Sequence, residues 1–339
     1  MANETPDFWW EKTGFLSTLL QPAAWVYGRV AQRNMETKIP PQINLPVLCV
    51  GNFTLGGAGK TPVAIAIARA AQGAGLKPGV VMRGFGGSVR GPHKVDVTRD
   101  RARDVGDEAL LLAAHADVVV DKDRYRGAQA LARDGCDFIV MDDGFQSRRL
   151  YADYSLLVVD AMRGIGNGLV FPAGPLRAPL ITQLAYSDGV LIMGEGVKGD
   201  EAVRFAARAA RPVDHAHSIS SAQQPVEGER FLAFAGIGNP QKFFAGIVAA
   251  GGIVAQTRTF ADHHFFNTYD IADIVASVKA NNLVAATTAK DYVRLKTDGL
   301  DQQFEQLYVF DVDVTFRRAG FCKMLIEETI ARYKERCLR

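Results

Sequence analysis

The chain has few cysteines, no large excess of charge of either sign and no long apolar run. Its four cysteines form no C-x-x-C pair, which excludes a zinc ribbon and argues against a disulfide framework. The 39 basic and 37 acidic residues give a net charge of +2, so the composition does not favour nucleic acid as a partner. The length of 339 residues is about twice that of a typical domain. We therefore expect a globular protein of two domains in a reducing compartment.

The N-terminal segment, about residues 8–34, is rich in aromatic residues and leucine, but polar side chains interrupt it too often for it to cross a bilayer. It also lacks the apolar core and the cleavage site of a secretory signal. The pattern suits two short amphipathic helices on either side of Pro22. They would either lie in a membrane interface or cover the protein's own core, and the pattern favours neither arrangement. In the membrane arrangement, the inserted side chains would include Trp9, Trp10, Phe15 and Leu19.

The rest of the chain alternates between short apolar runs and helical patterns. In the first half, apolar runs at 47–51, 79–82, 117–121 and 137–142 alternate with helical patterns at 60–72, 108–115 and 124–133. This alternation predicts βαβ units on a parallel sheet with helices on both faces. A second series has its apolar runs at 154–160, 189–193, 231–235 and 283–287. A stretch of alternating apolar and acidic residues and a final helical pattern follow, at 307–316 and 319–336.

A glycine-rich segment follows the first apolar run and precedes a helical pattern. It consists of Thr54, Leu55, Gly56, Gly57, Ala58, Gly59, Lys60 and Thr61. Apart from Thr54 in place of the first glycine, it has the form of a phosphate-binding loop, in which backbone N–H groups at a helix N-terminus hold a polyphosphate. Lys60 would contact the β- and γ-phosphates of a nucleotide, and Thr61 would contact Mg²⁺. The alternative is a glycine-rich turn that binds nothing.

Two carboxylates, Asp142 and Asp143, end the apolar run 138–141. In P-loop proteins an aspartate in this position holds Mg²⁺ or one of its water ligands. Because parallel sheets bind ligands at the carboxyl ends of their strands, we expect these side chains near the phosphate loop. Aspartates at strand ends also cap turns, and the sequence does not indicate which of the two would hold the metal.

Further segments with a distinctive composition are spread over the chain. With the phosphate loop they comprise Gly51 to Pro62, Arg83-Gly84-Phe85-Gly86, Gly106-Asp107-Glu108, Asp142-Asp143-Gly144-Phe145-Gln146, Phe171 to Arg177, Phe234 to Pro240 and Asp262-His263-His264. In this order they resemble the tetraacyldisaccharide 4'-kinases of lipid A biosynthesis, and Thr54 at the head of the loop is that family's own form. The resemblance spans nearly the whole chain. Three residues depart from the family's pattern, which has histidine at the first position and glutamate at the other two: Ser147, Ala178 and Ala289.

The resemblance implies transfer of the γ-phosphoryl group of ATP, with Mg²⁺, to the 4'-hydroxyl of a tetraacyldisaccharide 1-phosphate, a lipid A precursor, to give lipid IVA. The enzyme would be peripheral at the cytoplasmic face of the inner membrane, without an obligate protein partner. The implied fold is α/β, with a P-loop NTPase-like domain and a smaller α/β/α domain joined by a two-stranded linker. We expect the P-loop domain at 1–147 and 316–339, the second domain at 155–305, and the linker strands at 148–154 and 306–315.

The resemblance also implies the catalytic residues. Asp107 would accept the proton of the hydroxyl group, His263 would pair with Asp107 across the cleft between the domains, and Lys60 would stabilise the transferred charge. At the metal, Glu108 would join Thr61, Asp142 and Asp143. From the sequence alone, Asp107 and Glu108 also suit the N-terminus of a helix without any catalytic role. In the same way, His263 suits an ordinary exposed loop.

Two other functions fit parts of the sequence. One is a nucleotide-dependent switch, an ATPase or GTPase that signals through a partner, although the Asn-Lys-x-Asp stretch of guanine-specific proteins is absent. The other is a peripheral membrane scaffold built on the N-terminal helices. ATP turnover that depends on a lipid acceptor would distinguish the kinase from both, because a switch hydrolyses ATP without the acceptor and a scaffold does not turn it over.

Overall fold

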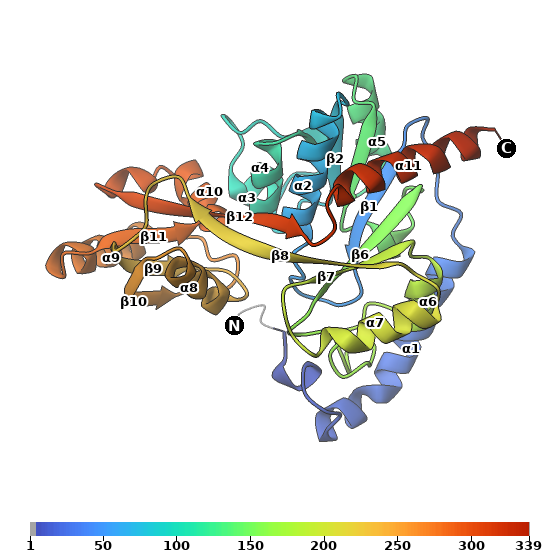
Figure 1. Cartoon of the computed structure of the whole chain (residues 1–339), viewed down its shortest axis with the longest axis horizontal. Helices are drawn as coiled ribbons and strands as arrows, with labels where there is room; N and C mark the ends of the chain where they lie inside the picture. The colour runs from blue at the N-terminus through green and yellow to red at the C-terminus, as the bar shows by residue number, and fades with distance from the viewer. Residues whose placement is uncertain (1–4, 339) are drawn as a thin grey trace.

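A computed structural model describes residues 5–338, and its strands form one mixed, mostly parallel sheet (Figure 1). The strands are β1 (Val47–Asn52), β2 (Pro78–Met82), β3 (His93–Lys94), β4 (Asp117–Val120), β5 (Phe138–Asp142), β6 (Tyr154–Asp160), β7 (Gly189–Met193), β8 (Val213–Ala222), β9 (Arg230–Ala235), β10 (Ile253–Thr259), β11 (Val284–Thr288) and β12 (Leu307–Phe316). Over the described range their spatial order is β10-β9-β11-β12-β8-β7-β6-β1-β5-β2-β4-β3. Of these pairings, β12 with β8 and β3 with β4 are antiparallel.

Helices cover both faces of the sheet. They are α1 (Phe15–Thr37), α2 (Lys60–Gly73), α3 (Ala102–Val105), α4 (Asp107–Ala113), α5 (Arg124–Arg133), α6 (Leu180–Ala185), α7 (Gly199–Arg208), α8 (Pro240–Ala249), α9 (Thr268–Ala280), α10 (Ala289–Thr297) and α11 (Phe321–Cys337), with short 3₁₀ turns η1 (Asp7–Trp9), η2 (Phe145–Ser147) and η3 (Asp301–Gln303). Around β1, one apolar core includes α2, α4 and α11, and the other includes α1, α5, α6 and α7. Around β9, α8 and α9 belong to separate cores. The sheet thus has two parts, a first part around β1 and a second part around β9, and each part has α/β/α layers.

The continuous apolar runs of the sequence form strands that are buried on both faces. β1, β2, β5 and β7 are buried along their whole length. A parallel strand covered by helices on both sides needs apolar side chains at every position, rather than at alternate ones. These strands bring the residues that follow β1 and β5 to the same edge of the sheet, because β1 and β5 are parallel neighbours.

The structure contradicts the predicted position of the domain boundary. Strands β6 and β7, predicted within the second domain at 155–305, extend the first part of the sheet, because β6 pairs with β1 and β7 pairs with β6. The antiparallel partner of β12 is β8, not the predicted linker strand 148–154. The second part of the chain therefore begins near β9. The apolar runs of the two parts have the same pattern, and this pattern does not indicate which strands pair. The boundary therefore cannot be predicted from the runs alone. Residues 1–4 and 339, at the ends of the predicted P-loop domain, lie outside the described residues.

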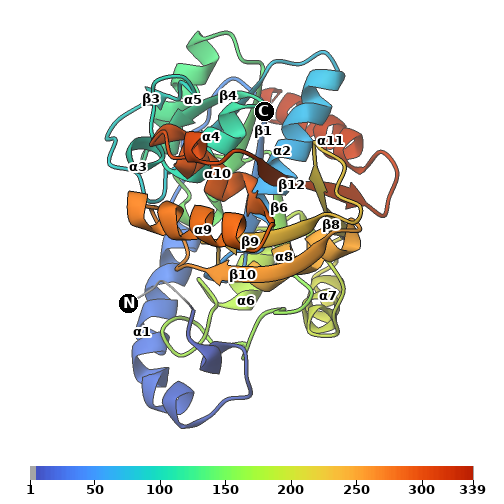
Figure 2. The same cartoon turned by 90° about the vertical axis from the view of Figure 1, so that its left-hand side faces the viewer.

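The N-terminal segment forms one helix after η1, not the two short helices expected on either side of Pro22. α1 (Phe15–Thr37) continues through Pro22, which lies inside the helix. Trp9, predicted among the inserted side chains, is only 5% exposed, and its Nε1 donates a hydrogen bond to the carbonyl of Pro172 at 3.0 Å. Asn167 Nδ2 lies 3.3 Å from Ser17 Oγ and fastens the start of α1 to the same loop. Figure 2 shows the N-terminal end of α1 extending away from the sheet.

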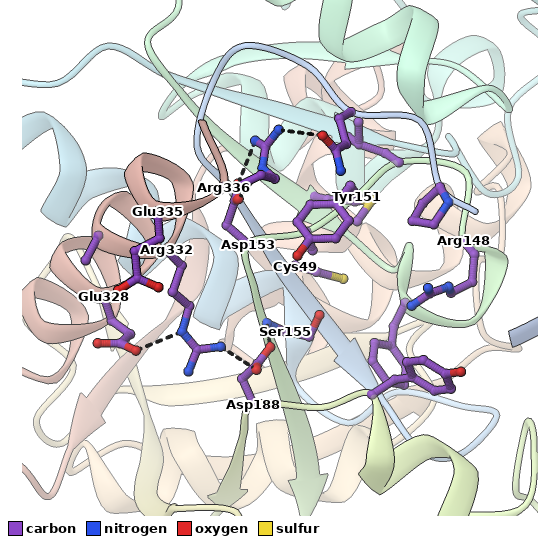
Figure 3. A pocket seen from close by; sticks show the side chains of 18 of the residues that line it. Cys49, Arg148, Tyr151, Asp153, Ser155, Asp188, Glu328, Arg332, Glu335 and Arg336 are labelled. Carbon is purple, nitrogen blue, oxygen red and sulfur yellow. Dashed lines mark hydrogen bonds and ion pairs between the residues drawn. The ribbon is translucent and has the colours of Figure 1, made fainter. Parts of the chain in front are cut away.

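The last helix, α11, packs back on the first part of the sheet through two arginines. Arg336 Nε donates to Asp153 Oδ1 at 2.8 Å, and Arg332 Nη1 pairs with Asp188 Oδ1 at 2.5 Å. Both pairs line a cavity of about 950 Å³ on this side of the molecule (Figure 3). Because the guanidinium groups of Arg332 and Arg336 already have their own carboxylates, we interpret the two pairs as the means by which the C-terminal helix is held in place.

Candidate active site

The segment 54–61 connects β1 to the N-terminus of α2. Gly59 precedes α2 with a φ of 84°, a left-handed conformation that glycine adopts without steric cost. Asn52, at the end of β1, donates from Nδ2 to the carbonyl of Thr54 at 2.7 Å and to that of Gly56 at 3.2 Å. The first N–H groups of a helix have no intrahelical partner, so this end of α2 can bind an anion.

The loop that precedes α6 fastens the start of this phosphate loop. The N–H of Leu55 donates to the carbonyl of Pro175 at 2.8 Å. Arg177 Nε donates to the carbonyl of Thr54 at 2.9 Å, while its Nη1 and Nη2 contact the two carboxylate oxygens of Asp143 at 2.7 and 3.2 Å. A segment for which the sequence alone suggests no physical task thus joins the phosphate loop to one of the two predicted metal ligands.

Asp142 and Asp143 stand in different environments at the end of β5. Burial raises the pKa of Asp143, but Lys60, with its Nζ 3.7 Å from Oδ1, and Arg177 lower it by more, so this pKa lies below its usual value. Burial and the charge of Glu108 raise the pKa of Asp142 to about 7. Oδ1 of Asp142 is buried and has no hydrogen-bond partner among the described residues. Asp143 is therefore an ion-paired carboxylate, whereas Asp142 has an unsatisfied oxygen.

The oxygen atoms offered around Asp142 suit Mg²⁺. This ion prefers oxygen ligands and is usually held by one or two carboxylates, with water and substrate phosphates completing the shell. The unpartnered oxygen of Asp142 and the carboxylate of Glu108 are of this kind, and Thr61 offers a hydroxyl at the start of α2. Within residues 5–338 no group of three or more His, Cys, Asp or Glu residues is placed to hold a metal ion. Of the two aspartates, Asp142 is the better candidate ligand, because Asp143 already contacts Arg177 and Lys60.

The raised pKa of Asp142 predicts that Asp142→Asn stabilises the metal-free protein at alkaline pH. The folded pKa of about 7 lies above the reference value of 3.8, so the folded state binds more protons between these values and stability falls as pH rises from about 4 to about 7. Asparagine removes this loss, which we expect to be on the order of 2–4 kcal/mol at pH 8. Melting temperatures at pH 5 and pH 8 in EDTA measure it. A variant that is no more stable than wild type at pH 8 would contradict the assigned environment.

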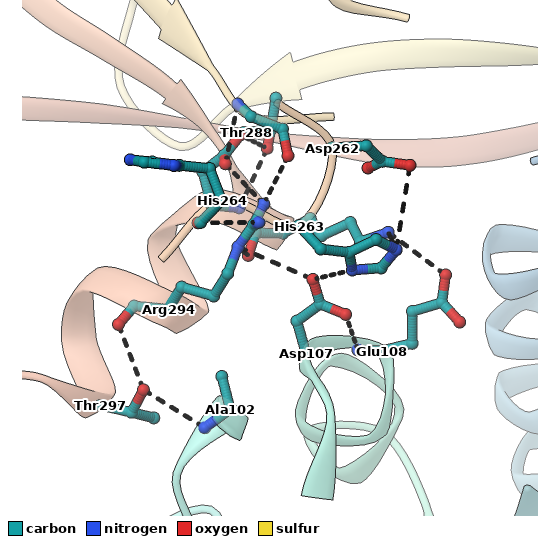
Figure 4. A network of polar contacts seen from close by, with 12 residues as sticks. Ala102, Asp107, Glu108, Asp262, His263, His264, Thr288, Arg294 and Thr297 are labelled. Carbon is teal, nitrogen blue, oxygen red and sulfur yellow. Dashed lines mark hydrogen bonds and ion pairs between the residues drawn. The ribbon is translucent and has the colours of Figure 1, made fainter. Parts of the chain in front are cut away.

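Asp107 and His263 belong to segments next to different parts of the sheet, and their side chains form a hydrogen bond (Figure 4). Asp107 is the first residue of α4 and is 4% exposed, and His263 lies in the loop after β10. Nδ1 of His263 lies 3.0 Å from Oδ2 of Asp107. Burial raises the pKa of Asp107, but the hydrogen bond with His263 and the charges of Lys290 and Arg294 lower it by more, so its pKa is below the usual value. Asp107 is therefore an ionised carboxylate at neutral pH.

Lys290 makes a second contact between the two parts. Its Nζ lies 3.3 Å from Oε1 of Glu108 and 3.4 Å from Nε2 of His263. Burial lowers the pKa of Lys290, but the carboxylates of Asp107, Glu108 and Asp262 raise it by more, so the ammonium group stays charged. A cation thus lies beside Nε2 of His263, the ring nitrogen that does not contact Asp107.

A cavity of about 1530 Å³ lies between the two parts of the sheet. Its wall includes the phosphate loop from Gly57 to Thr61 and Glu108 on one side, and Asp262 and Lys290 on the other. The N-terminus of α2, which can bind phosphate, and the oxygen atoms of Thr61 and Glu108, which suit Mg²⁺, therefore border one cleft. The pair of Asp107 and His263 does not line it, but each residue is next in sequence to one that does, Glu108 or Asp262. This arrangement can hold a polyphosphate next to a group that accepts a proton.

The comparisons with known proteins agree with this geometry. The family model for tetraacyldisaccharide-1-P 4'-kinase, LpxK, matches residues 16–330. The tetraacyldisaccharide 4'-kinases of Bartonella quintana and Brucella suis are each 53% identical to this chain over 336 and 338 residues, covering 99% of it and 98% and 99% of those proteins. The chain belongs to the tetraacyldisaccharide 4'-kinase family. The crystal structure of LpxK from Aquifex aeolicus in complex with ATP has the same fold, with a TM-score of 0.71 and 23% identity over 93% of this chain and 99% of that one.

Membership of the 4'-kinase family confirms the main predictions from the sequence. The resemblance, the P-loop NTPase-like α/β fold and the function of a kinase that phosphorylates the 4'-hydroxyl of a lipid A precursor are all confirmed. The match over nearly the whole chain does not favour a nucleotide switch or a membrane scaffold. The roles of single residues stay predictions, which the geometry can support.

The structure places about half of the predicted site residues in the wall of the cleft. Lys60, Thr61 and Glu108 line the cavity, and Asp107 reaches His263. Asp107, His263, Asp142 and Asp143 do not line it, and neither do Thr54, Leu55 and Gly56, which the sequence predicts to contact the nucleotide. Backbone groups of this part of the loop instead bond within the protein, to the residues described above. Three residues that hold the site together have no predicted role: Asn52, Arg177 and Lys290. Asn52 and Arg177 lie within segments that carry the family resemblance, and Lys290 follows Ala289, one of the departures from the family's pattern.

Proposed function

We propose that this 4'-kinase transfers the γ-phosphoryl group of ATP, with Mg²⁺, in the cleft between the two parts of the sheet. Asp107 is the base and His263 is its partner. The contact of 3.0 Å between Nδ1 of His263 and Oδ2 of Asp107 carries the proposal, because it links residues 156 positions apart, and Glu108, next to Asp107, lines the same cavity as the phosphate loop. A hydrogen-bonded pair from opposite walls of a cleft suits a base that forms on closure.

In the transfer, the 4'-hydroxyl oxygen of the acceptor attacks the γ-phosphorus, the bond from that phosphorus to the ADP oxygen breaks, and the hydroxyl proton passes to Asp107. The carboxylate is fixed on both sides, because Oδ1 accepts the N–H of Glu108 at 2.8 Å and Oδ2 contacts His263. Its ionised state at neutral pH leaves it able to accept a proton. Positioning and charge stabilisation supply most of the catalysis in such reactions.

The residues that would hold Mg²⁺ are Asp142, Thr61 and Glu108, and Asp143 keeps Lys60 and Arg177 in place. Bound Mg²⁺ would neutralise charge on the transferred phosphoryl group. Lys60 would contact the β- and γ-phosphates from the start of α2. Arg177 then acts at a distance from the reaction, because its guanidinium orients Asp143 and the loop carbonyl of Thr54.

The strands β8 and β12 make this site dependent on closure. They form the antiparallel ribbon that joins the two parts of the sheet (Figure 1). The pairs His263–Asp107 and Lys290–Glu108 both span the cleft. Closure would therefore assemble the base and exclude water at the same time, and a kinase needs both in order to avoid hydrolysing ATP.

Mass spectrometry tests the proposed reaction directly. The protein is incubated with a tetraacyldisaccharide 1-phosphate, ATP and Mg²⁺. We expect one added phosphate on the 4'-position of the lipid, ADP formed in equal amount, and loss of both products when EDTA is present. ATP hydrolysis at the same rate without the lipid would contradict the proposal, because it would indicate a switch rather than a kinase.

The exposed face of α1 supports peripheral association with the cytoplasmic face of the inner membrane. No helix within residues 5–338 combines the length and the apolar character needed to span a bilayer. Phe15 is 80% exposed, Leu19 is 64% exposed and Trp25 is 65% exposed, all on the helix that extends away from the sheet. Apolar side chains of this size on one surface helix are typical of interfacial binding. A lipid acceptor keeps its acyl chains in the bilayer, so the cleft must be brought to the headgroups.

Replacing Phe15, Leu19 and Trp25 together by serine should weaken binding to lipid vesicles and raise the apparent KM for the lipid acceptor. The melting temperature should change little, since these side chains cover no core. Trp9→Ser is the matched control, because Trp9 is 5% exposed and its loss should cost about 3 kcal/mol of folding free energy. Vesicle sedimentation and thermal unfolding measure the two effects. Strong destabilisation of the triple variant with unchanged sedimentation would refute the membrane role of α1.

A further inference from the structure

Arg294, on α10, is a buried cation to which the roles above assign no function. Its side chain is 1% exposed, and Nη2 lies 2.6 Å from Oδ1 of Asp291. Asp291 is also buried, and its oxygens accept the N–H of Gly236 at 3.0 Å and the hydroxyl of Thr288 at 2.6 Å. A buried ion pair is often no more stabilising than apolar residues of the same volume, so stability alone does not explain it.

The remaining donors of Arg294 hold the backbone around His263. Nη2 donates to the carbonyl of Gly236 at 2.9 Å, and Nη1 donates to the carbonyl of His264 at 3.1 Å. The Gly236 carbonyl also accepts the N–H of His263 at 3.1 Å. His263 has a φ of 59°, in the left-handed region, which residues other than glycine occupy when their surroundings impose it. Arg294 supplies part of that constraint.

Arg294 also reaches the opposite wall of the cleft. Its Nε lies 3.7 Å from Oδ2 of Asp107, the same oxygen that His263 contacts at 3.0 Å. Figure 4 shows the contacts of Arg294 and His263 converging on Asp107. At this distance the charge of the guanidinium favours the ionised form of the carboxylate, while the N–H of Nε donates to the carbonyl of Lys290 at 3.4 Å.

We propose that Arg294 is a positioning residue for the phosphoryl transfer. It sets the backbone that carries His263, the partner of Asp107, while Asp291 neutralises and orients its guanidinium. The inference rests on the proposed function, because Arg294 acts only through the Asp107–His263 pair. It predicts that Arg294 affects the chemical step and not the binding of ATP.

Arg294→Met and Arg294→Lys test this role in steady-state kinetics. Methionine keeps the apolar stem but removes all donors, whereas lysine keeps the charge but lacks the planar fork that reaches two carbonyls at once. We expect Arg294→Met to lower kcat about 10- to 100-fold with a KM for ATP within about twofold of wild type. Arg294→Lys should recover part of the lost kcat. If Arg294→Met does not fold, Arg294→Gln, which retains one amide donor group, replaces it in every comparison.

His263→Ala distinguishes positioning from a general loss of structure. If Arg294 acts through His263, Arg294→Met should cost less than about twofold in the His263→Ala background. Arg336→Met is the matched control, because Arg336 also pairs with a buried aspartate, Asp153, but does so on α11. We expect this control to lower the melting temperature and to leave kcat unchanged.

Different results would overturn the two proposals. A wild-type kcat for Arg294→Met, or the full loss repeated in the His263→Ala background, would overturn the positioning role while the proposed pair stands. A wild-type kcat for His263→Ala would instead overturn the pairing of His263 with Asp107, and the role of Arg294 with it.

Discussion

Replacing Lys60 with alanine should lower kcat by about 10³-fold while the chain stays folded. Lys60 begins α2 and lines the cavity, and its side chain is 12% exposed. In phosphoryl transfer the enzyme mainly positions the groups and stabilises the charge that moves with the phosphoryl group. Removing this cation should therefore act on the transition state more than on nucleotide binding, and kcat should fall by more than the KM for ATP rises.

The fold should tolerate this substitution because Asp143 keeps its contacts with Nη1 and Nη2 of Arg177, at 2.7 and 3.2 Å. Lys77→Ala is the matched control, since Lys77 also lies within 4 Å of an aspartate, Asp117, but is 54% exposed and does not line the cavity. Steady-state kinetics and melting temperatures for both variants check the prediction. Near-normal turnover of Lys60→Ala would rule out the phosphate loop as the nucleotide site.

The sequence predicts those parts of the fold that depend on local pattern. The runs 47–51, 79–82, 138–141 and 189–193 become β1, β2, β5 and β7, because a strand covered on both faces must be apolar throughout. β8 has mainly polar and exposed positions, so it gives no such pattern and was not predicted. The predicted ribbon partner of β12, 148–154, is therefore the wrong segment. The prediction that places β6 and β7 in the second domain is wrong for a related reason. Which strands are neighbours depends on tertiary pairing, and the local sequence pattern does not indicate it.

The candidate site also has parts that the local sequence predicts and parts that depend on tertiary structure. The phosphate loop and Asp142 with Asp143 are local motifs, and parallel pairing of β1 with β5 brings them together as predicted. The pair of Asp107 and His263 is separated by 156 positions, so only the family resemblance pointed to it. Nothing local indicates that Arg177 pairs with Asp143, because that contact depends on how the loop before α6 folds over the phosphate loop.

Single alanine substitutions of Asp107 and His263 should each lower kcat by about 10²- to 10³-fold, since general base catalysis contributes in this range. The double variant should lose little more than the worse single variant. Removing either residue leaves the other without its partner across the cleft, so the second substitution has little left to remove. Independent roles would instead give losses that multiply, to about 10⁴-fold or more.

The two outcomes separate the candidate functions of His263 because its contacts differ on its two nitrogens. Nδ1 faces Asp107, whereas Nε2 lies 3.4 Å from Lys290 and 3.9 Å from Asp262. Multiplicative losses would place the action of His263 on the Nε2 side, toward the sugar or the phosphate, and not on the base. His93→Ala is the control, because His93 contacts Asp100 at 2.8 Å within one part of the chain and should leave kcat unchanged. A loss in the double variant close to that of Asp107→Ala alone, with His93→Ala fully active, is the result that makes Asp107 and His263 one catalytic unit.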